Sequence, residues 1–221
     1  MPDVRTLNQF QDALDVEMSW RVKEIGVFHV ASKQNGPEHR FFIRAGVALA
    51  YAHWEGFVKT ASETYLSFVE SRGHTYKELK TCFAVFGLKA KLNMLSTSRK
   101  SVPNIEAFDF ILGEMEQKAA MRLSKAIDTE SNLTSKVFAN IATSLDISVD
   151  PYSTKFNLID ESLVARRNRI AHGEFMDIGG KEFGDLVDQV VQLMRDYKTD
   201  LQNAASREGY KRPPAASAAQ S

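Results

Sequence analysis

Apolar residues recur along the chain at the spacing of amphipathic α-helices, and no segment alternates convincingly as a strand would. The first such segment covers about 4–31, with Asp3 available as its N-terminal cap. Its apolar positions are Leu7, Phe10, Leu14, Met18, Ile25 and Phe28. Gly36 and Pro37 mark the turn that follows it.

The next predicted helix, 38–71, is about 50 Å long and carries two apolar stripes. One stripe consists of Phe42, Ala45, Leu49, Ala52 and Gly56, and the other of Ile43, Val47, Trp54, Val58, Ala61 and Tyr65. A helix that is apolar on two sides is expected at the centre of a bundle. His53 lies beside the first stripe, where it is either a hydrogen-bonded core or interface residue or a residue near the active site.

The rest of the chain predicts shorter helices and one further long helix. Apolar spacing indicates a helix over about 76–96, a break at 101–104 that contains Pro103, and a weak helix over 105–123. A loop then leads to a helix capped at Asn132 or Thr134. A helix that begins between Phe156 and Asp160 and a long one over 180–204 complete the set.

These elements predict an all-α bundle of long antiparallel helices with an inserted helical mid-segment. We expect a single domain over 1–206. Residues 207–221 have too few apolar side chains to fold alone and are predicted to form a disordered tail.

The composition limits the classes of ligand, cross-link and cellular location that this chain is expected to have. The chain has 221 residues and 43% hydrophobic content, enough for a sizeable core. Because 28 basic residues balance 28 acidic ones, any anionic ligand must be held by a local cluster. The single Cys82 excludes an intramolecular disulfide. Neither a signal-like N-terminus nor a membrane span is present, so we expect a cytoplasmic protein without membrane attachment.

The most informative stretch is LVARRNRIAHGE at 163–174, because an arginine interrupts the apolar side of the predicted helix. At about 100° per residue, Arg167 projects from the side that holds Leu163, Val164, Ile170 and Ala171. A guanidinium is costly to bury alone, so Arg167 must meet a carboxylate, a phosphate or a polar cavity.

Two further polar residues share this sector. Asn168 and His172 are four residues apart and therefore lie on one face, and Gly173 is a natural helix stop. His172 could move protons near neutral pH, and Arg167 could hold phosphate oxygens. Asn168 could orient either group. A group that moves protons and a cation that holds the phosphate are the requirements for metal-free RNA cleavage. The structural alternative is that Arg167 pairs with a carboxylate inside the bundle.

Other site chemistry finds little support. AVFGLKAK lacks the glycine spacing of a phosphate-binding loop, and the five histidines show no metal-binding spacing. No nucleophile elbow is present, although a serine triad is not excluded. We therefore expect no metal and no cofactor. Since one chain supplies a single histidine of this kind, a twofold dimer would provide the second.

ARRNRIAHGE resembles the signature of HEPN domains, in which an Arg, a polar residue and a His stand near the end of a helix. AYAHWEGFVK (50–59) and TESNLTSKVFANIATSLDI (129–147) resemble segments of the MAE_28990/MAE_18760-like HEPN subfamily, in the expected order. The resemblance implies a helical bundle, a homodimer with a composite cleft, and metal-independent endoribonuclease activity, often in prokaryotic defence or toxin–antitoxin systems.

Position by position, Arg167 and His172 match the catalytic pair of the family, and Asn168 matches the polar residue after the Arg. We expect Arg166 and Arg169 to add positive charge for the RNA backbone. The expected partners are RNA, a second copy of the chain, and an antitoxin or defence-system protein. The alternative is a non-catalytic HEPN module that binds a partner protein or a nucleotide.

Overall fold

The computed structural model describes residues 4–33, 36, 38–121 and 126–213. Within these ranges the chain is helical, with two isolated β-bridges as its only strand-like pairings, which confirms the all-α prediction. No helix in these ranges is apolar over the length needed to cross a membrane. The elements are α1 (Leu7–Ala31), α2 (His39–Ser71), α3 (Thr81–Thr97), α4 (Ser101–Glu114), α5 (Ser135–Ser144), η1 (Asp150–Lys155), η2 (Leu158–Ala165), α6 (Arg166–Ala171) and α7 (Gly180–Ser206).

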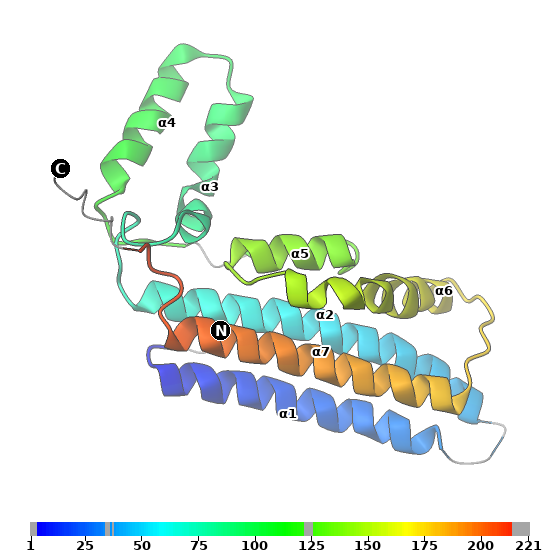
Figure 1. The fold of residues 1–221 in the computed structure, drawn as a ribbon. Helices are drawn as coiled ribbons and strands as arrows, with labels where there is room; N and C mark the ends of the chain where they lie inside the picture. Colours follow the sequence, from blue (N-terminus) through cyan, green and yellow to red (C-terminus); the bar gives the residue numbers. More distant parts are fainter. Residues whose placement is uncertain (1–3, 34–35, 37, 122–125, 214–221) are drawn as a thin grey trace, which may run out of the picture.

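The three long helices form the first layer as a bundle in which each contacts the other two, and α1 runs antiparallel to both α2 and α7 (Figure 1). α1 begins with a capping box. The Thr6 side chain accepts a hydrogen bond from Gln9 N at 3.2 Å, and the Gln9 side chain accepts one from Thr6 N at 3.1 Å. The predicted cap Asp3 and the turn residue Pro37 lie outside the described residues.

α2 is the central helix, as its two stripes predicted, but only one stripe is fully buried. The residues from Ile43 to Tyr65 in the second stripe are buried throughout, whereas Ala45 and Ala52 of the first are exposed. α7 packs closely on α2 because Gly46 has no side chain: a Cβ there would lie 2.3 Å from Phe183 Cζ.

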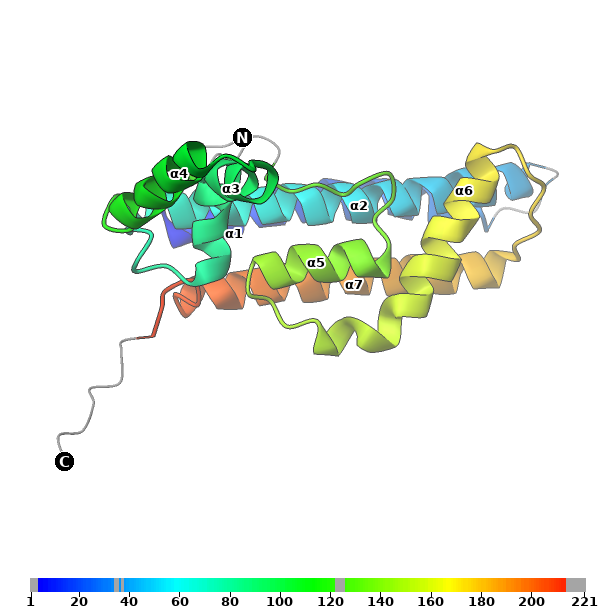
Figure 2. The same ribbon diagram turned by 90° about the horizontal axis from the view of Figure 1, so that it is seen from above.

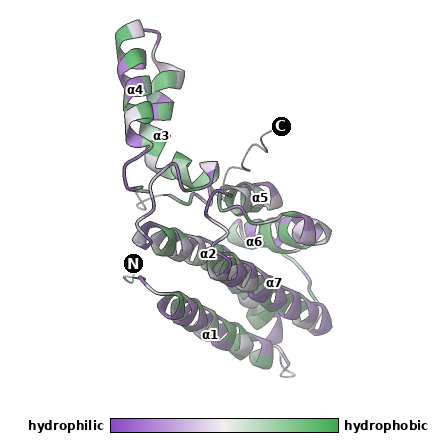
Figure 3. Cartoon of the chain, turned by 60° about the vertical axis from the view of Figure 1, so that its left-hand side comes forward, coloured by the Kyte–Doolittle hydropathy of each residue, from purple (hydrophilic) through white to green (hydrophobic). Residues whose placement is uncertain are grey.

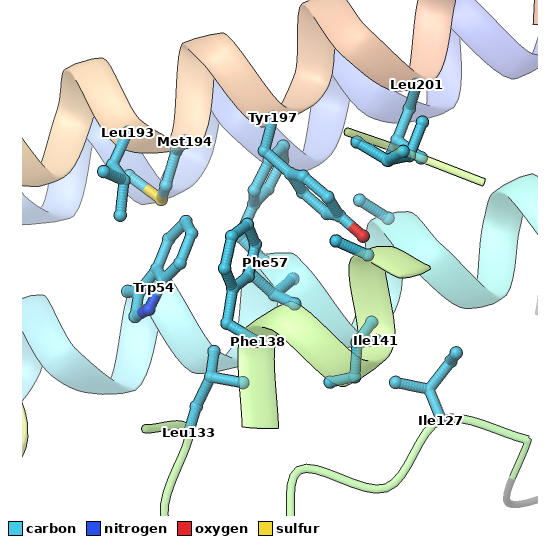
Figure 4. Packing of buried hydrophobic residues seen from close by; sticks show 14 of the residues in the cluster. Trp54, Phe57, Ile127, Leu133, Phe138, Ile141, Leu193, Met194, Tyr197 and Leu201 are labelled. Carbon is cyan, nitrogen blue, oxygen red and sulfur yellow. The ribbon is translucent and has the colours of Figure 1, made fainter. Parts of the chain in front are cut away.

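A second layer, formed by α5 and by η2 with α6, covers α2 and α7 (Figure 2). Aromatic side chains join the two layers (Figure 4). The Phe138 ring of α5 lies 5.2 Å from Trp54 of α2 and 5.5 Å from Tyr197 of α7, measured between ring centres. The buried Tyr197 hydroxyl shares a 2.7 Å hydrogen bond with Ser62 Oγ. The core therefore lies both among the three long helices and between them and the second layer.

α3 and α4 form a hairpin that stands away from the bundle (Figure 1). The predicted break at 101–104 is instead the first turn of α4, and the helix ends at Glu114 rather than near 123. Pro103 is tolerated because backbone N–H groups in a first turn have no partner within the helix.

The chain stays packed beyond α7. Tyr210 is buried against the ring of Phe68, and its carbonyl accepts a 2.8 Å hydrogen bond from Lys80 N. The packed chain thus continues past residue 206, where the sequence predicted a tail to begin. One buried tyrosine and this backbone pairing hold 207–213 in place, and 214–221 lie outside the described residues.

Candidate functional site

The motif stands at the end of a continuous helical segment with two geometries. η2 is a π-helix, and it passes directly into the six-residue α6. Gly173, at φ +77°, ends the helix as predicted. Glu174 N donates to Arg169 O at 2.9 Å and Gly173 N to Ile170 O at 3.1 Å, which is a Schellman ending. His172 is therefore the C-cap, the last position before the chain turns.

Burial decreases along this segment toward the motif. Leu163 and Val164 are buried, Ile170 is half-buried, and Ala171 is exposed. The apolar side expected around Arg167 thus ends beside it. Arg167 lies half-buried at the border between core and solvent rather than in the middle of an apolar face.

Tyr51 of α2 supports the Arg167 guanidinium. The Arg167 Cζ lies 4.3 Å from the centre of the Tyr51 ring, a cation–π contact worth about 1 kcal/mol when partly desolvated. Arg167 Nη1 donates to Asn168 Oδ1 at 3.0 Å, and Nη2 makes a long 3.5 Å contact to Ser131 O. Among the described residues Arg167 forms no ion pair, so the bundle does not offer it a carboxylate.

Tyr51 is itself held in place by the burial of its ring and by a hydrogen bond to its hydroxyl. Its ring is buried, and its hydroxyl accepts a 2.8 Å hydrogen bond from Leu133 N in the loop before α5. Burial raises the pKa of the Tyr51 hydroxyl, against the lowering effect of the Leu133 N–H and of Arg167. The hydroxyl therefore stays protonated at neutral pH. Sequence reasoning missed Tyr51; the signal was an aromatic residue on the central helix while an arginine elsewhere needed a partner.

The neighbouring arginines are paired. Arg166 forms an ion pair with Glu182 of α7, and Arg169 Nε lies 3.0 Å from Glu174 Oε2. Arg166 and Glu182 also line a hollow with Lys155, Glu161 and Asp185, where three carboxylates outnumber two cations, an unfavourable setting for a phosphate. The predicted RNA contacts of Arg166 and Arg169 would have to compete with these carboxylates. Of the motif's three arginines, Arg167 has the least compensated charge.

His172 is exposed at the helix end. Its backbone N donates to Asn168 O at 2.9 Å, while its imidazole makes no hydrogen bond, ion pair or ring contact with any described residue. The structure thus brings Arg167 and Asn168 into direct contact. It places His172 one turn further on, with its imidazole available to a ligand.

The loop before α5 is anchored to the motif's helical segment. Asp160 of η2 accepts hydrogen bonds from Ser135 N at 2.7 Å and Ser135 Oγ at 2.6 Å. The N-cap is Thr134, whose side chain accepts from Val137 N, so the second of the two predicted caps is the one used. These bonds keep Ser131 and Leu133 in reach of Arg167 and Tyr51.

His53 belongs to a different contact. It is buried between α2 and α1, with Nε2 3.1 Å from Glu24 Oε2 and its ring 5.2 Å from that of Trp20. Because Tyr51 and His53 are two residues apart on one helix, they point nearly opposite ways. Of the two roles considered for His53, the geometry favours the interface between α1 and α2.

No group of three or more histidine, cysteine or acidic side chains in the described part of the chain is arranged to hold a metal ion.

Comparison with protein families matches the RiboL-PSP-HEPN model to residues 16–203, which covers the bundle, the hairpin and the α6 motif. The MAE_28990/MAE_18760-like subfamily that two segments resemble stays a prediction. Comparisons with curated proteins and with solved structures give no match. The match spans most of the chain and agrees with its helical architecture, so the chain belongs to the RiboL-PSP-HEPN family of HEPN domains.

Proposed function

We propose that this protein is a metal-independent endoribonuclease whose catalytic residues are Arg167, Asn168 and His172. The observation that carries the proposal is that the positive charge of Arg167 is not compensated. It is held on the Tyr51 ring without a carboxylate partner among the described residues, beside an exposed histidine. A cation held in this way suits a phosphodiester, whose oxygens a guanidinium can bind in pairs.

In the proposed reaction, the ribose 2′-hydroxyl attacks the adjacent phosphorus and loses its proton to a general base. The bond from phosphorus to the 5′-oxygen breaks, and a general acid protonates that oxygen. The products are a 2′,3′-cyclic phosphate and a 5′-hydroxyl. An imidazole can both donate and accept a proton near neutral pH, so it can serve as either acid or base. Arg167 stabilises the charge that develops on the phosphate oxygens, and Asn168 orients the guanidinium through their 3.0 Å hydrogen bond.

A twofold dimer would supply the second histidine that separate acid and base roles require. The surface around the motif supports this part of the proposal. Phe175, three residues after His172, and Phe41 are 68% and 71% exposed. Arg44, one turn after Phe41 on α2, donates from Nη2 to Glu174 O at 2.9 Å, which brings the two exposed rings to the same end of the molecule. Burying them against a second copy would stabilise the dimer.

The deciding experiment incubates purified protein with RNA in excess chelator. We expect cleavage to persist, to end in 2′,3′-cyclic phosphate, and to be lost in His172→Ala and Arg167→Ala. Arg169→Ala is the matched control because its guanidinium is already paired with Glu174. Loss of cleavage on chelation, or full cleavage by His172→Ala, would reject the proposal.

A non-catalytic interaction module is the second candidate, favoured by the large apolar side chains that α3 and α4 expose. In that case the chain would bind a partner such as an antitoxin or a defence-system protein. Partner binding and cellular phenotype would then be unchanged in His172→Ala. Toxicity that disappears in this variant would instead support the ribonuclease.

A further inference from the structure

The α3–α4 hairpin, which stands away from the bundle, carries hydrophobic residues along both of its helices (Figure 3), and several of them are exposed. On α4 the four most exposed lie between 54% and 65% accessible, and α3 adds three at 38% to 40%. The residues are Val102, Ile105, Phe108 and Leu112 of α4 and Val85, Leu92 and Met94 of α3. Contiguous exposed apolar side chains on this scale mark an interaction surface.

The α4 side chains form a stripe. Val102, Ile105, Phe108 and Leu112 recur every three or four residues and share one side of the helix. Ala107, the only buried residue of α4, lies on the other side, where α4 packs on α3. The hairpin therefore pairs its inner faces and leaves an outer apolar face without a partner in the described chain.

The charges of the hairpin are divided between its helices. α3 carries Lys89 and Lys91 and no acidic residue, whereas α4 carries Glu106, Asp109 and Glu114 and no basic residue. Lys89, Glu106 and Asp109 form no ion pair with any described residue. A twofold arrangement of two hairpins, with α3 against α4 of the other copy, would match a basic helix to an acidic one twice. The surface is thus complementary to itself.

We propose that the hairpin binds the hairpin of a second copy of this chain through these exposed apolar side chains. α3 has 17 residues and α4 has 14, and only their outer faces would meet the partner, so the contact is smaller than the about 20–30 residues on each side of a standard interface.

This contact is separate from the catalytic motif and does not rest on the ribonuclease proposal. The hairpin stands at one end of α2, and α6 packs near the other end (Figures 1 and 2). If both contacts form, the hairpin joins motif-linked dimers into larger assemblies. Whether or not the motif-linked contact also forms, breaking the hairpin contact halves the mass of the assembly in the simplest closed arrangement.

The test measures solution mass by light scattering at micromolar concentration for the full chain. We expect Ile105→Ser with Phe108→Ser to reduce the mass about twofold with unchanged helical content. The matched control, Val27→Ser with Val30→Ser, removes equally exposed apolar side chains from α1 and leaves the mass unchanged. A wild-type mass no greater than that of the Ile105/Phe108 variant overturns the proposal.

A charge exchange tests the pairing of α3 with α4. Asp109→Lys and Lys89→Glu should each weaken association when alone, and an equimolar mixture of the two should recover the wild-type mass. Recovery supports the arrangement because only a contact between copies can restore it. Failure of the mixture to associate while each variant remains helical would overturn it. Neither result depends on whether the chain cleaves RNA.

Discussion

The Arg167 Cζ stands 4.3 Å from the centre of the Tyr51 ring, and the Tyr51 hydroxyl accepts a hydrogen bond from Leu133 N. One α2 residue therefore connects the motif arginine to the loop before α5. The position of that arginine depends on two segments far from it in sequence. Tyr51 is accordingly a positioning residue in the proposed site.

Substitutions at Tyr51 should separate the contribution of the ring from that of the hydroxyl. Tyr51→Leu removes the cation–π contact, and we expect kcat/KM for RNA to fall about tenfold, the equivalent of about 1.4 kcal/mol. Tyr51→Phe keeps the ring but leaves Leu133 N–H without its acceptor, so it should lower the free energy of unfolding by about 1–3 kcal/mol and keep most activity. Kinetics and urea unfolding of both variants distinguish the effects. Equal activities would contradict the role of the ring.

The three arginines should contribute unequally to RNA affinity. Arg167→Ala should weaken binding of a non-cleavable 2′-deoxy substrate analogue and reduce the salt dependence by about one phosphate contact. Arg166→Ala and Arg169→Ala should weaken it less, because Glu182 and Glu174 already balance those charges. Titrations of each variant with the analogue at several salt concentrations measure the affinity and its salt dependence. Three equal losses would show that the ion pairs open on binding.

Asp160 should matter for stability although it does not touch the motif. Asp160→Ala removes the acceptor for Ser135 N and Ser135 Oγ, and we expect the free energy of unfolding to fall by about 2 kcal/mol. Asp188→Ala, an exposed acidic residue on α7, is the control and should change it by less than about 0.5 kcal/mol. Urea denaturation of the two variants provides the comparison. Similar losses would mean that the Ser135 bonds contribute little.

His53 should make the protein less stable in mild acid. Burial lowers the pKa of His53, which the Glu24 carboxylate opposes and Arg21 reinforces. As pH falls through about 6.5, the unfolded chain binds a proton that the folded chain accepts only at lower pH, so stability decreases in that window. Glu17 is the other nearby carboxylate, paired with Arg21 at 3.0 Å. The urea midpoint should therefore drop more between pH 7.5 and 5.5 for wild type than for His53→Gln; parallel drops would exclude His53 as the cause.

The sequence predicted what depends on local pattern. Helical spacing located the ends of α1, α2 and α7 to within three residues, because each has an apolar side several turns long. Gly173 marked a helix end correctly, and Thr134 was one of the two N-caps predicted for α5, since capping chemistry is local.

Contacts between distant segments were beyond the sequence pattern. The support of Arg167 by Tyr51 joins residues more than a hundred positions apart, and the Arg166–Glu182 pair joins α6 to α7. Pro103 suggested a break because proline ends helices, yet it stands in a first turn that needs no donor. The π geometry of η2 has no simple sequence signal, so the prediction used an α-helical rotation throughout.

That π segment determines which way the motif faces. An α-helix turns about 100° per residue, while a π turn holds an extra residue and advances less. If Leu158–Ala165 wound as an α-helix of the same length, Arg167, Asn168 and His172 would rotate together, away from Tyr51. Their mutual spacing would be untouched. A working site in this chain thus depends on how the motif is rotated relative to α2 as much as on the spacing of its residues.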